Sequence, residues 1–399
     1  ISACLVGSEM CIRDREKMRC TKAIIYSENL RHNIAEIKKN LKKGVKLCCA
    51  VKANGYGNDA VNSARIAEEM GAEYLAVATV PEGIQLRNAG IKAELLLLSP
   101  CCPEEFEELV DSRITPLVFD SEIIRELNTI AGDMTDEKYP VFLAVDTGMG
   151  RIGCLPEEAG EIAAEIDKCQ SLKLAGMITH FAESDGISRN AIEYTKRQFE
   201  QFKSAIEKVE KAGINPGIRT CSASAAGIAF PEYQMDMVRP GIILYGYYAD
   251  EITKAYLESK KIKLDLKPVM QLETKVAAIR HFIPGRAVSY GCTWICENET
   301  DIAVLPVGYA DGLLRRNSPG LKVSINGKAY PVVGRICMDQ CMVDIGNGNR
   351  EIKRWDKAII FGPKDKGSLF DADDIARATG TISYEIMTSV SDRVERIIL

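Results

Sequence analysis

Eight short, almost continuously apolar segments recur between residues 45 and 246, and this recurrence is the strongest constraint on the fold. An unbroken apolar run of six to ten residues is typical of a strand that is covered on both faces, as in a parallel sheet. The predicted strands are 45–51, 74–80, 94–99, 114–119, 139–146, 172–180, 218–223 and 237–246.

Helical patterns separate these segments. In 27–43, Leu30, Ile34, Ile37 and Leu41 recur on one helical face, and Ser27 is a suitable N-cap. Similar spacing is found in 156–168 and 194–213. Eight strands, each followed by a helical segment, predict a (β/α)8 barrel of the TIM type.

Beyond about residue 256 the pattern changes to strand-like runs separated by Gly, Asn and Pro. We therefore predict two domains, a barrel over 18–255 and a mostly-β C-terminal domain over 256–399. The first residues, "ISACLVGSEMCIRDREK" (1–17), have neither a long apolar core nor a small-residue cleavage site, and are interpreted as a non-native extension.

Composition narrows the class of protein. The chain has 399 residues, 46% of them apolar, and a net charge of -5, which argues against nucleic acid or an anionic membrane as partner. No apolar run approaches membrane-spanning length. The 14 cysteines form no C-x-x-C pair, so thiols of a reducing cytoplasm are expected rather than disulfides, and no metal site is predicted.

In a barrel of this type, chemistry is located at the carboxyl ends of the strands. Several charged or hydroxyl-bearing residues stand at those positions. Any one of them alone is common in a loop, but their convergence on one rim predicts a site. They are Lys52, Asp146 with Arg151 just beyond, His180, Ser224 and Arg239.

The last two barrel strands favour a phosphate site, because barrels often bind phosphate there with backbone amides and a short helix. "CSASAAG" supplies the hydroxyls of Ser222 and Ser224, and "RPGI" supplies the amides of Gly241 and Ile242. A lysine across the barrel from a phosphate site predicts pyridoxal 5'-phosphate (PLP), because a primary amine condenses with its aldehyde.

Eight motifs of the chain together resemble the alanine racemases, PLP-dependent enzymes of fold type III. They are "AVKANGYG", "VDTGMGRIG", "THFA", "RPGIILYG", "SYGCTW", "LPVGYADGLLR", "GRICMDQCMVDI" and "TISYE", and they span almost the whole chain after Met18. The resemblance implies a small amino-acid substrate and a head-to-tail homodimer. Each active site would combine one barrel with the β domain of the other subunit.

The resemblance also implies residue roles. Lys52 matches the cofactor lysine, which also serves as the base on the face of the D enantiomer. Tyr309 matches the base for the opposite face, contributed by the other subunit. Racemisation needs both, because a base on one side of a planar carbon returns the proton only to that side.

Further roles follow by the same matching. Arg239 matches the arginine at the cofactor's ring nitrogen, His180 the histidine packed beside it, and Arg151 the arginine that contacts the cofactor and the substrate carboxylate. The phosphate contacts correspond to Tyr56, Ser224, Gly241, Ile242 and Tyr384, and the substrate side to Tyr290 and Met338. Seven residues before Arg151 the family often has a lysine, where this chain has Ala144, so another group must steer Arg151.

Three alternatives to an alanine racemase remain open at this point. One is a serine or broad-specificity racemase of the same fold, and the residues do not decide this. A fold III decarboxylase would have a carboxylate in place of Arg239. A PLP carrier without turnover is usually a barrel alone. Nor does the sequence decide between D-alanine biosynthesis and breakdown.

Overall fold

The structure, a computed structural model, describes residues 19–399 and divides into two compact units. One unit comprises 27–269, and the other joins 19–26 to 270–399. The extension expected at 1–17 lies outside the described residues.

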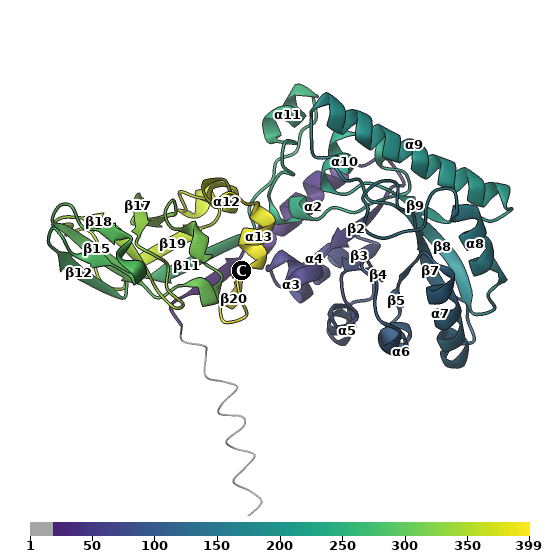
Figure 1. Ribbon diagram of the computed structural model, residues 1–399, viewed down its shortest axis with the longest axis horizontal. Helices are drawn as coiled ribbons and strands as arrows, with labels where there is room; N and C mark the ends of the chain where they lie inside the picture. Colours follow the sequence, from purple (N-terminus) through teal and green to yellow (C-terminus); the bar gives the residue numbers. More distant parts are fainter. Residues whose placement is uncertain (1–18) are drawn as a thin grey trace, which may run out of the picture. The chain divides into compact units, whose positions relative to one another are not determined.

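The unit 27–269 is built on parallel strands, in the order β10-β2-β3-β4-β5 and β6-β7-β8-β9 (Figure 1). Both groups pair in parallel throughout. The strands are β2 (Lys46–Ala50), β3 (Tyr74–Val77), β4 (Glu94–Leu97), β5 (Ile114–Thr115), β6 (Leu117–Val118), β7 (Tyr139–Ala144), β8 (Leu172–Ile178), β9 (Ile218–Thr220) and β10 (Met237–Val238).

Two junctions close these strands into a barrel. Strands β5 and β6 are halves of one predicted strand, interrupted at Pro116, whose carbonyl accepts a hydrogen bond from the Phe142 amide at 3.0 Å. Between β9 and β10, the amide of Arg239 donates to the carbonyl of Ser222 at 3.1 Å. The predicted barrel is therefore confirmed.

Helices follow the strands and cover the outside of the barrel (Figure 1). In α2, Leu30, Ile34 and Ile37 are buried, as their spacing predicted. The helices are α2 (Ser27–Lys39), α3 (Lys52–Tyr56), α4 (Ala60–Glu69), α5 (Val80–Asn88), α6 (Phe106–Asp111), α7 (Ser121–Met134), α8 (Ala159–Lys168), α9 (Arg189–Lys211), α10 (Ser224–Ala229) and α11 (Lys254–Ser259), with 3-10 turns η1 (Pro103–Glu105), η2 (Pro231–Tyr233) and η3 (Ile242–Tyr245).

The last barrel strand is shorter than predicted. The apolar run 237–246 contributes only two residues to β10, and 242–245 form the buried turn η3 instead. Pro240 interrupts the run because it has no amide to donate to a neighbouring strand. The turn ends at Gly246, where φ is +95° and a Cβ would lie 2.1 Å from the Lys267 carbonyl oxygen.

The second unit is mostly β, as predicted. Its main sheet has the order β12-β15-β18-β17-β16-β19-β11-β1-β20. The strands are β1 (Lys22–Ile25), β11 (Met270–Lys275), β12 (Ala278–Phe282), β15 (Thr300–Leu305), β16 (Lys322–Ile325), β17 (Lys328–Val333), β18 (Cys341–Gly346), β19 (Lys357–Phe361) and β20 (Glu395–Ile398), beside the small pair β13 (Ala287–Val288) and β14 (Trp294–Ile295).

The unit boundaries differ from the predicted domain boundaries at two places. Strand β1 was assigned to the barrel domain, but it pairs antiparallel with β11 and parallel with β20, so 19–26 belongs to the β unit. Residues 256–269, assigned to the β domain, belong to the barrel unit. Short turns and helices complete the β unit: η4 (Tyr290–Cys292), η5 (Tyr309–Asp311), η6 (Arg315–Asn317), η7 (Lys364–Lys366), α12 (Ala372–Thr379) and α13 (Ser383–Thr388).

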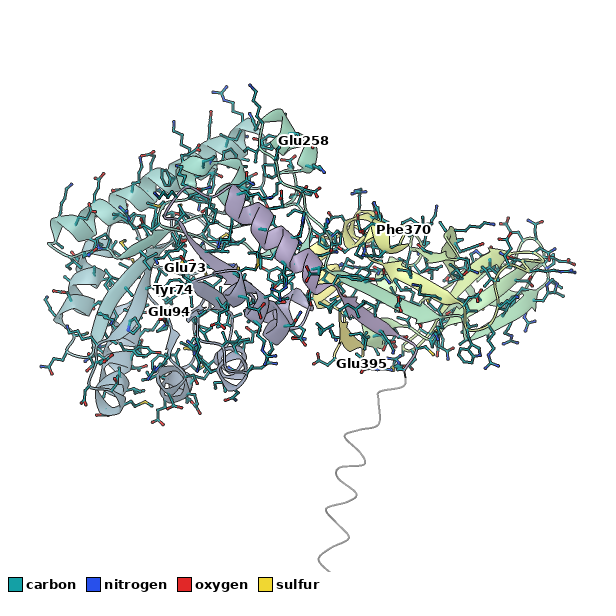
Figure 2. All side chains as sticks on the ribbon, turned by 180° about the vertical axis from the view of Figure 1, so that it is seen from behind. Glu73, Tyr74, Glu94, Glu258, Phe370 and Glu395 are labelled. Atoms are coloured by element: carbon teal, nitrogen blue, oxygen red, sulfur yellow. The ribbon has the colours of Figure 1, made fainter. Side chains whose placement is uncertain are left out.

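The two ends of the barrel strands carry different chemistry. At the amino ends, Glu73, Tyr74 and Glu94 lie together at the starts of β3 and β4 (Figure 2). Here Glu73 accepts a hydrogen bond from the Leu47 amide at 2.9 Å and so fixes the start of β2. The predicted site residues stand at the opposite ends. Of the helices that the structure describes, none has the length and apolar character needed to cross a membrane.

Candidate active site

Lys52 begins a left-handed turn directly after the first barrel strand. The amide of Val51 still donates to the Ala76 carbonyl at 2.9 Å, as in a strand, and the backbone then enters the left-handed helical region. Ala53, Asn54 and Gly55 have φ/ψ of 51/51°, 53/46° and 62/44°, which are left-handed helical values. This turn places Lys52 at the carboxyl end of the barrel, as the sequence predicted, and Tyr56 follows in the same turn.

Tyr56, Gly241 and Ser224 form one compact group. The Tyr56 ring is buried and stacks on Tyr245 with centroids 4.9 Å apart. A Cβ at position 241 would lie 2.5 Å from the Tyr56 hydroxyl oxygen, so only glycine fits there. The Gly241 amide donates to the Ser224 hydroxyl oxygen at 2.9 Å, and Ile242 begins the following turn η3.

A buried hydroxyl adjoins this group. The Ser222 oxygen is fully buried and has no hydrogen-bond partner among the described residues. An unsatisfied buried hydroxyl costs free energy, so such an atom marks a place where a polar ligand group fits. Ser222 stands two residues before Ser224, in the segment for which the sequence predicted a phosphate site.

Arg239 is buried at the end of β10 and is held on three sides. Its guanidinium donates to the Thr220 hydroxyl at 2.5 Å, to the Thr179 carbonyl at 2.8 Å and to His180 Nδ1 at 3.3 Å. Because guanidinium nitrogens only donate, Nδ1 of His180 is the acceptor. Burial, and then the positive charges of Arg239, Arg151 and Lys52, lower the pKa of His180 to about 3, so this imidazole is neutral.

The amine of Lys52 lies in the electrostatic field of the same cations. Burial lowers its pKa, and the charges of Arg151 and Arg239 lower it further, while Glu82 acts in the opposite direction. A lysine with a depressed pKa has a larger neutral fraction near neutral pH, and only the neutral amine is a nucleophile or a base. The structure thus brings together Lys52, Arg151, His180 and Arg239 on one rim.

Arg151 itself is exposed, and its loop is organised by backbone contacts. Asp146 accepts hydrogen bonds from the amides of Gly148 and Gly150, at 2.9 and 3.1 Å. Tyr194 donates to the Gly148 carbonyl at 2.6 Å. Ala144, where a lysine was expected, is buried in β7, and its carbonyl accepts from the Cys154 amide at 3.0 Å. The loop is therefore held without a lysine at this position.

The β unit carries the other predicted residues. Tyr309 and Met338 are neighbours, because the Tyr309 amide donates to the Cys337 carbonyl at 3.0 Å and the Ala310 amide to the Met338 carbonyl at 2.9 Å. Asp311 is fully buried behind this turn, where it accepts from the Gly308 amide at 3.0 Å and pairs with Arg19.

Tyr290 and Tyr384 stand on segments that adjoin this turn. The Ser289 hydroxyl donates to the Arg335 carbonyl at 2.5 Å, which ties the Tyr290 turn to the segment leading to Met338. The Ser389 hydroxyl donates to the Gly312 carbonyl at 2.9 Å, which ties the helix of Tyr384 to the Tyr309 turn. Tyr290, Tyr309 and Met338 are 68%, 41% and 52% exposed, respectively.

Sequence reasoning missed the residues that hold Arg239 in place. Thr179 and Thr220 were counted only as parts of strands. Gln198 on α9 was counted only in a helical pattern, but it is buried, accepts from the Ala182 amide at 2.9 Å and donates to the His180 carbonyl at 3.3 Å. The available signal was a polar residue at the end of an apolar strand, as in "THFA" and "IRTCSA".

Both units of the chain match families of known proteins. Residues 25–249 match the family described as alanine racemase, N-terminal domain, and residues 269–398 match alanine racemase, C-terminal domain. The chain is 47% identical to an alanine racemase of Treponema denticola over 384 residues, which is 96% of this chain and 99% of that protein.

Solved structures give the same result. An alanine racemase of Clostridium difficile is 39% identical with a TM-score of 0.87, and the match covers 95% of this chain and 96% of that one. An alanine racemase of Bacillus anthracis with bound L-Ala-P is 32% identical with a TM-score of 0.87, over 96% and 95% of the two chains.

Proposed function

The chain belongs to the alanine racemase family of isomerases, and from this premise we propose that it interconverts L-alanine and D-alanine with PLP as cofactor. The observation that carries the proposal is that two features share one end of the barrel. One is Lys52, whose pKa is lowered, and the other is the group of hydroxyls and amides formed by Ser222, Ser224 and Gly241. A cytoplasmic location is part of the proposal, which the free thiols of the described cysteines support.

The barrel residues fit PLP by their donor set. The unpartnered Ser222 hydroxyl, the Ser224 hydroxyl and the amides of Gly241 and Ile242 would hold the phosphate, with the phenol of Tyr56 beside them. Tyr384 in the β unit is proposed as a further phosphate contact. Bound PLP supplies an aldehyde that condenses with amines and a ring that withdraws electrons from the carbon losing its proton.

Arg239 and Arg151 are proposed to orient the bound molecules. Arg239 stays charged at any relevant pH, so at the ring nitrogen it would oppose protonation of that nitrogen. Its three acceptors fix it there, and the neutral His180 beside it adds no charge. Exposed Arg151 would receive the substrate carboxylate, with Tyr290 and the Met338 amide on the substrate side.

Two groups are proposed to move the proton. Nζ of Lys52 would take it from, or return it to, Cα on the D face, and the Tyr309 hydroxyl would do so on the L face. The L-face residues Tyr290, Tyr309 and Met338 are exposed on the β unit. Exposed aromatic and methionine side chains are enriched at protein interfaces, which supports a homodimer in which one chain's β unit completes its partner's site.

A chiral assay with D- and L-alanine, and with D- and L-serine, tests the function with and without added PLP. We expect alanine to be racemised, and Lys52→Ala to lose both the activity and the visible absorption of bound PLP. Lys46→Ala, at the other end of the same strand, is the matched control and should keep both. Racemisation of serine alone would assign a different substrate, and a PLP-coloured, active Lys52→Ala protein would refute the proposal.

A further inference from the structure

The turn that carries Lys52 is held in an unfavourable backbone conformation. Ala53, Asn54 and Tyr56 have φ of 51°, 53° and 52°. Left-handed backbone costs about 1–2 kcal/mol for each ordinary L residue, although Asn tolerates it better. A run of such residues persists only where surrounding contacts determine it. Contacts from outside the turn must therefore stabilise it.

Glu82 provides one such contact from another part of the barrel. Its Oε1 accepts a hydrogen bond from the Ala53 amide, the first amide after Lys52, at 2.8 Å. Its Oε2 accepts from the Ala78 amide, just beyond the end of β3, at 2.8 Å. One carboxylate thus joins the residues that follow two adjacent barrel strands, and each oxygen is used in a charge-assisted hydrogen bond.

Helix capping alone does not account for this geometry. Glu82 lies three residues after Thr79, the N-cap of α5, where a capping-box glutamate would accept from the N-cap amide itself. Here the carboxylate accepts instead from Ala78 and Ala53, and Ala53 lies 29 residues earlier in the chain.

We propose that Glu82 is a positioning residue for Lys52: its carboxylate fixes the left-handed turn and thereby sets where the lysine amine emerges at the barrel mouth. The inference rests on the proposed function, in which Lys52 binds PLP and moves the proton. Glu82 itself touches no reacting atom in this scheme.

The charge of Glu82 adds a second effect on the same lysine. Arg151 and Arg239 lower the pKa of Lys52, and Glu82 raises it, so the carboxylate partly offsets two cations. Without that offset the amine would lose its proton at lower pH. Asp keeps the charge with a shorter reach, whereas Gln keeps the reach but loses the charge and one of the two acceptor oxygens, so the two variants affect position and charge to different degrees.

The test uses the full-length chain after removal of PLP, and follows PLP capture by visible absorbance as a function of pH. Capture requires the neutral amine, so its pH midpoint reports the Lys52 proton. For Glu82→Gln we expect the midpoint to fall, because the carboxylate that raises the pKa of Lys52 has been neutralised. The dissociation constant for PLP should rise about tenfold, because a charge-assisted hydrogen bond is lost. Glu82→Asp should keep the midpoint and still weaken PLP binding.

Glu68→Gln is the matched control. Glu68 also holds two backbone amides, those of Lys92 and Ala93, both at 2.7 Å, and no effect of Glu68 on the pKa of Lys52 is found. Both bonds are accepted by the same oxygen, Oε1, which a glutamine keeps, so this variant removes a carboxylate charge from the barrel without removing an acceptor. It should change neither the midpoint nor PLP affinity. If Glu68→Gln moves both readouts as far as Glu82→Gln does, the effect is not specific to Glu82 and the inference is wrong.

The outcomes separate this inference from the proposed function. A midpoint and a PLP affinity in Glu82→Gln equal to those of the wild type would overturn the positioning role while Lys52→Ala still lost the PLP band. Retention of that band by Lys52→Ala would overturn both. If Glu82→Gln fails to fold, Glu82→Asp decides, and wild-type PLP affinity in that variant would contradict the inference.

Discussion

The barrel rim and the Tyr309 turn of the β unit differ in which part of the predicted site residues is held in place, the side chain or the backbone. On the rim, Arg239 is buried and its guanidinium has three protein acceptors. On the β unit, the backbone of the turn is anchored by buried Asp311, whereas the side chains of Tyr290, Tyr309 and Met338 are exposed. On the rim the side chain is fixed by its own protein partners, whereas on the β unit the backbone is fixed and the side chains remain exposed.

Exchange of subunits gives the largest expected effect. Tyr309→Phe should lower racemisation by about 10²-fold or more, because it removes one proton-transfer group, with PLP still bound. If the rim and the Tyr309 turn meet across a dimer, mixing Lys52→Ala with Tyr309→Phe should restore activity. Half the dimers would be mixed, each with one intact site, so about one quarter of the wild-type rate is expected.

The measurement is a chiral assay after co-refolding of the two inactive variants. Each variant refolded alone is the control. If no activity returns although mixed dimers form, Lys52 and Tyr309 of one chain would serve the same site, and the β unit would complete its own barrel.

Asp311→Ala should give the next largest effect, in the β unit alone. The carboxylate pairs with Arg19 and Arg393 and accepts a hydrogen bond from the Gly308 amide, so its removal leaves the buried Gly308 amide and the partly buried Arg19 without this partner. We expect a loss of about 3 kcal/mol in the free energy of unfolding. Both tryptophans of the chain, Trp294 and Trp355, lie in the β unit, so tryptophan fluorescence follows its unfolding.

Asp339→Asn is the matched control for this change. Asp339 also pairs with Arg393, at 2.8 Å, but both side chains are about half exposed. Exposed pairs contribute little, so we expect a change within about 0.5 kcal/mol. Equal losses in the two variants would mean that the buried anchor of the Tyr309 turn is no stronger than a surface ion pair.

One pH effect on stability, that of His180, should arise in the barrel. The pKa of His180 is about 3 in the folded protein and about 6.5 in the unfolded chain. Between these two pH values the imidazole is protonated in the unfolded chain and neutral in the folded protein. The contribution of neutral His180 to the free energy of unfolding is fully present above pH 6.5. It is lost as the pH falls toward 3, at up to about 1.4 kcal/mol per pH unit.

Urea unfolding of wild type and His180→Asn between pH 7 and 4 measures this effect. Circular dichroism follows the whole chain and tryptophan fluorescence follows the β unit. The wild type should lose more stability on acidification than the variant by circular dichroism, with no such difference by fluorescence. Parallel pH profiles in both proteins would mean that His180 is not held neutral.

The same contrast explains what the sequence could predict. Most of the barrel strands, and with them the position of Lys52, were predictable because each is an almost continuous apolar run, but Pro116 and Pro240 interrupt two of the predicted strands. The pairing of β1 with β11 and β20 was not, because its partners are about 250 and 370 residues away. The contacts from Glu82 to Ala53, from Gln198 to Ala182 and from Arg239 to Thr179 likewise join residues 29, 16 and 60 positions apart, which the barrel fold brings together.

The smallest expected effect concerns Arg151, which is exposed, whereas Arg239 on the same rim is buried. Its loop is fixed by Asp146 and by the Tyr194 hydroxyl, which donates to the Gly148 carbonyl at 2.6 Å. Tyr194→Phe removes about 1 kcal/mol of this restraint. If Arg151 receives the substrate carboxylate, KM for alanine should rise about two- to fivefold while kcat changes less than twofold.

Tyr248→Phe is the control for that variant, because Tyr248 donates to the Leu264 carbonyl at the same 2.6 Å in a different part of the barrel unit. Steady-state kinetics in both directions should show the KM change only in Tyr194→Phe. An unchanged KM would mean that the two hydrogen bonds accepted by Asp146 order the loop without help from Tyr194. A fall in kcat with constant KM would instead place Tyr194 in the chemistry, because removing an interaction made only in the transition state has that signature.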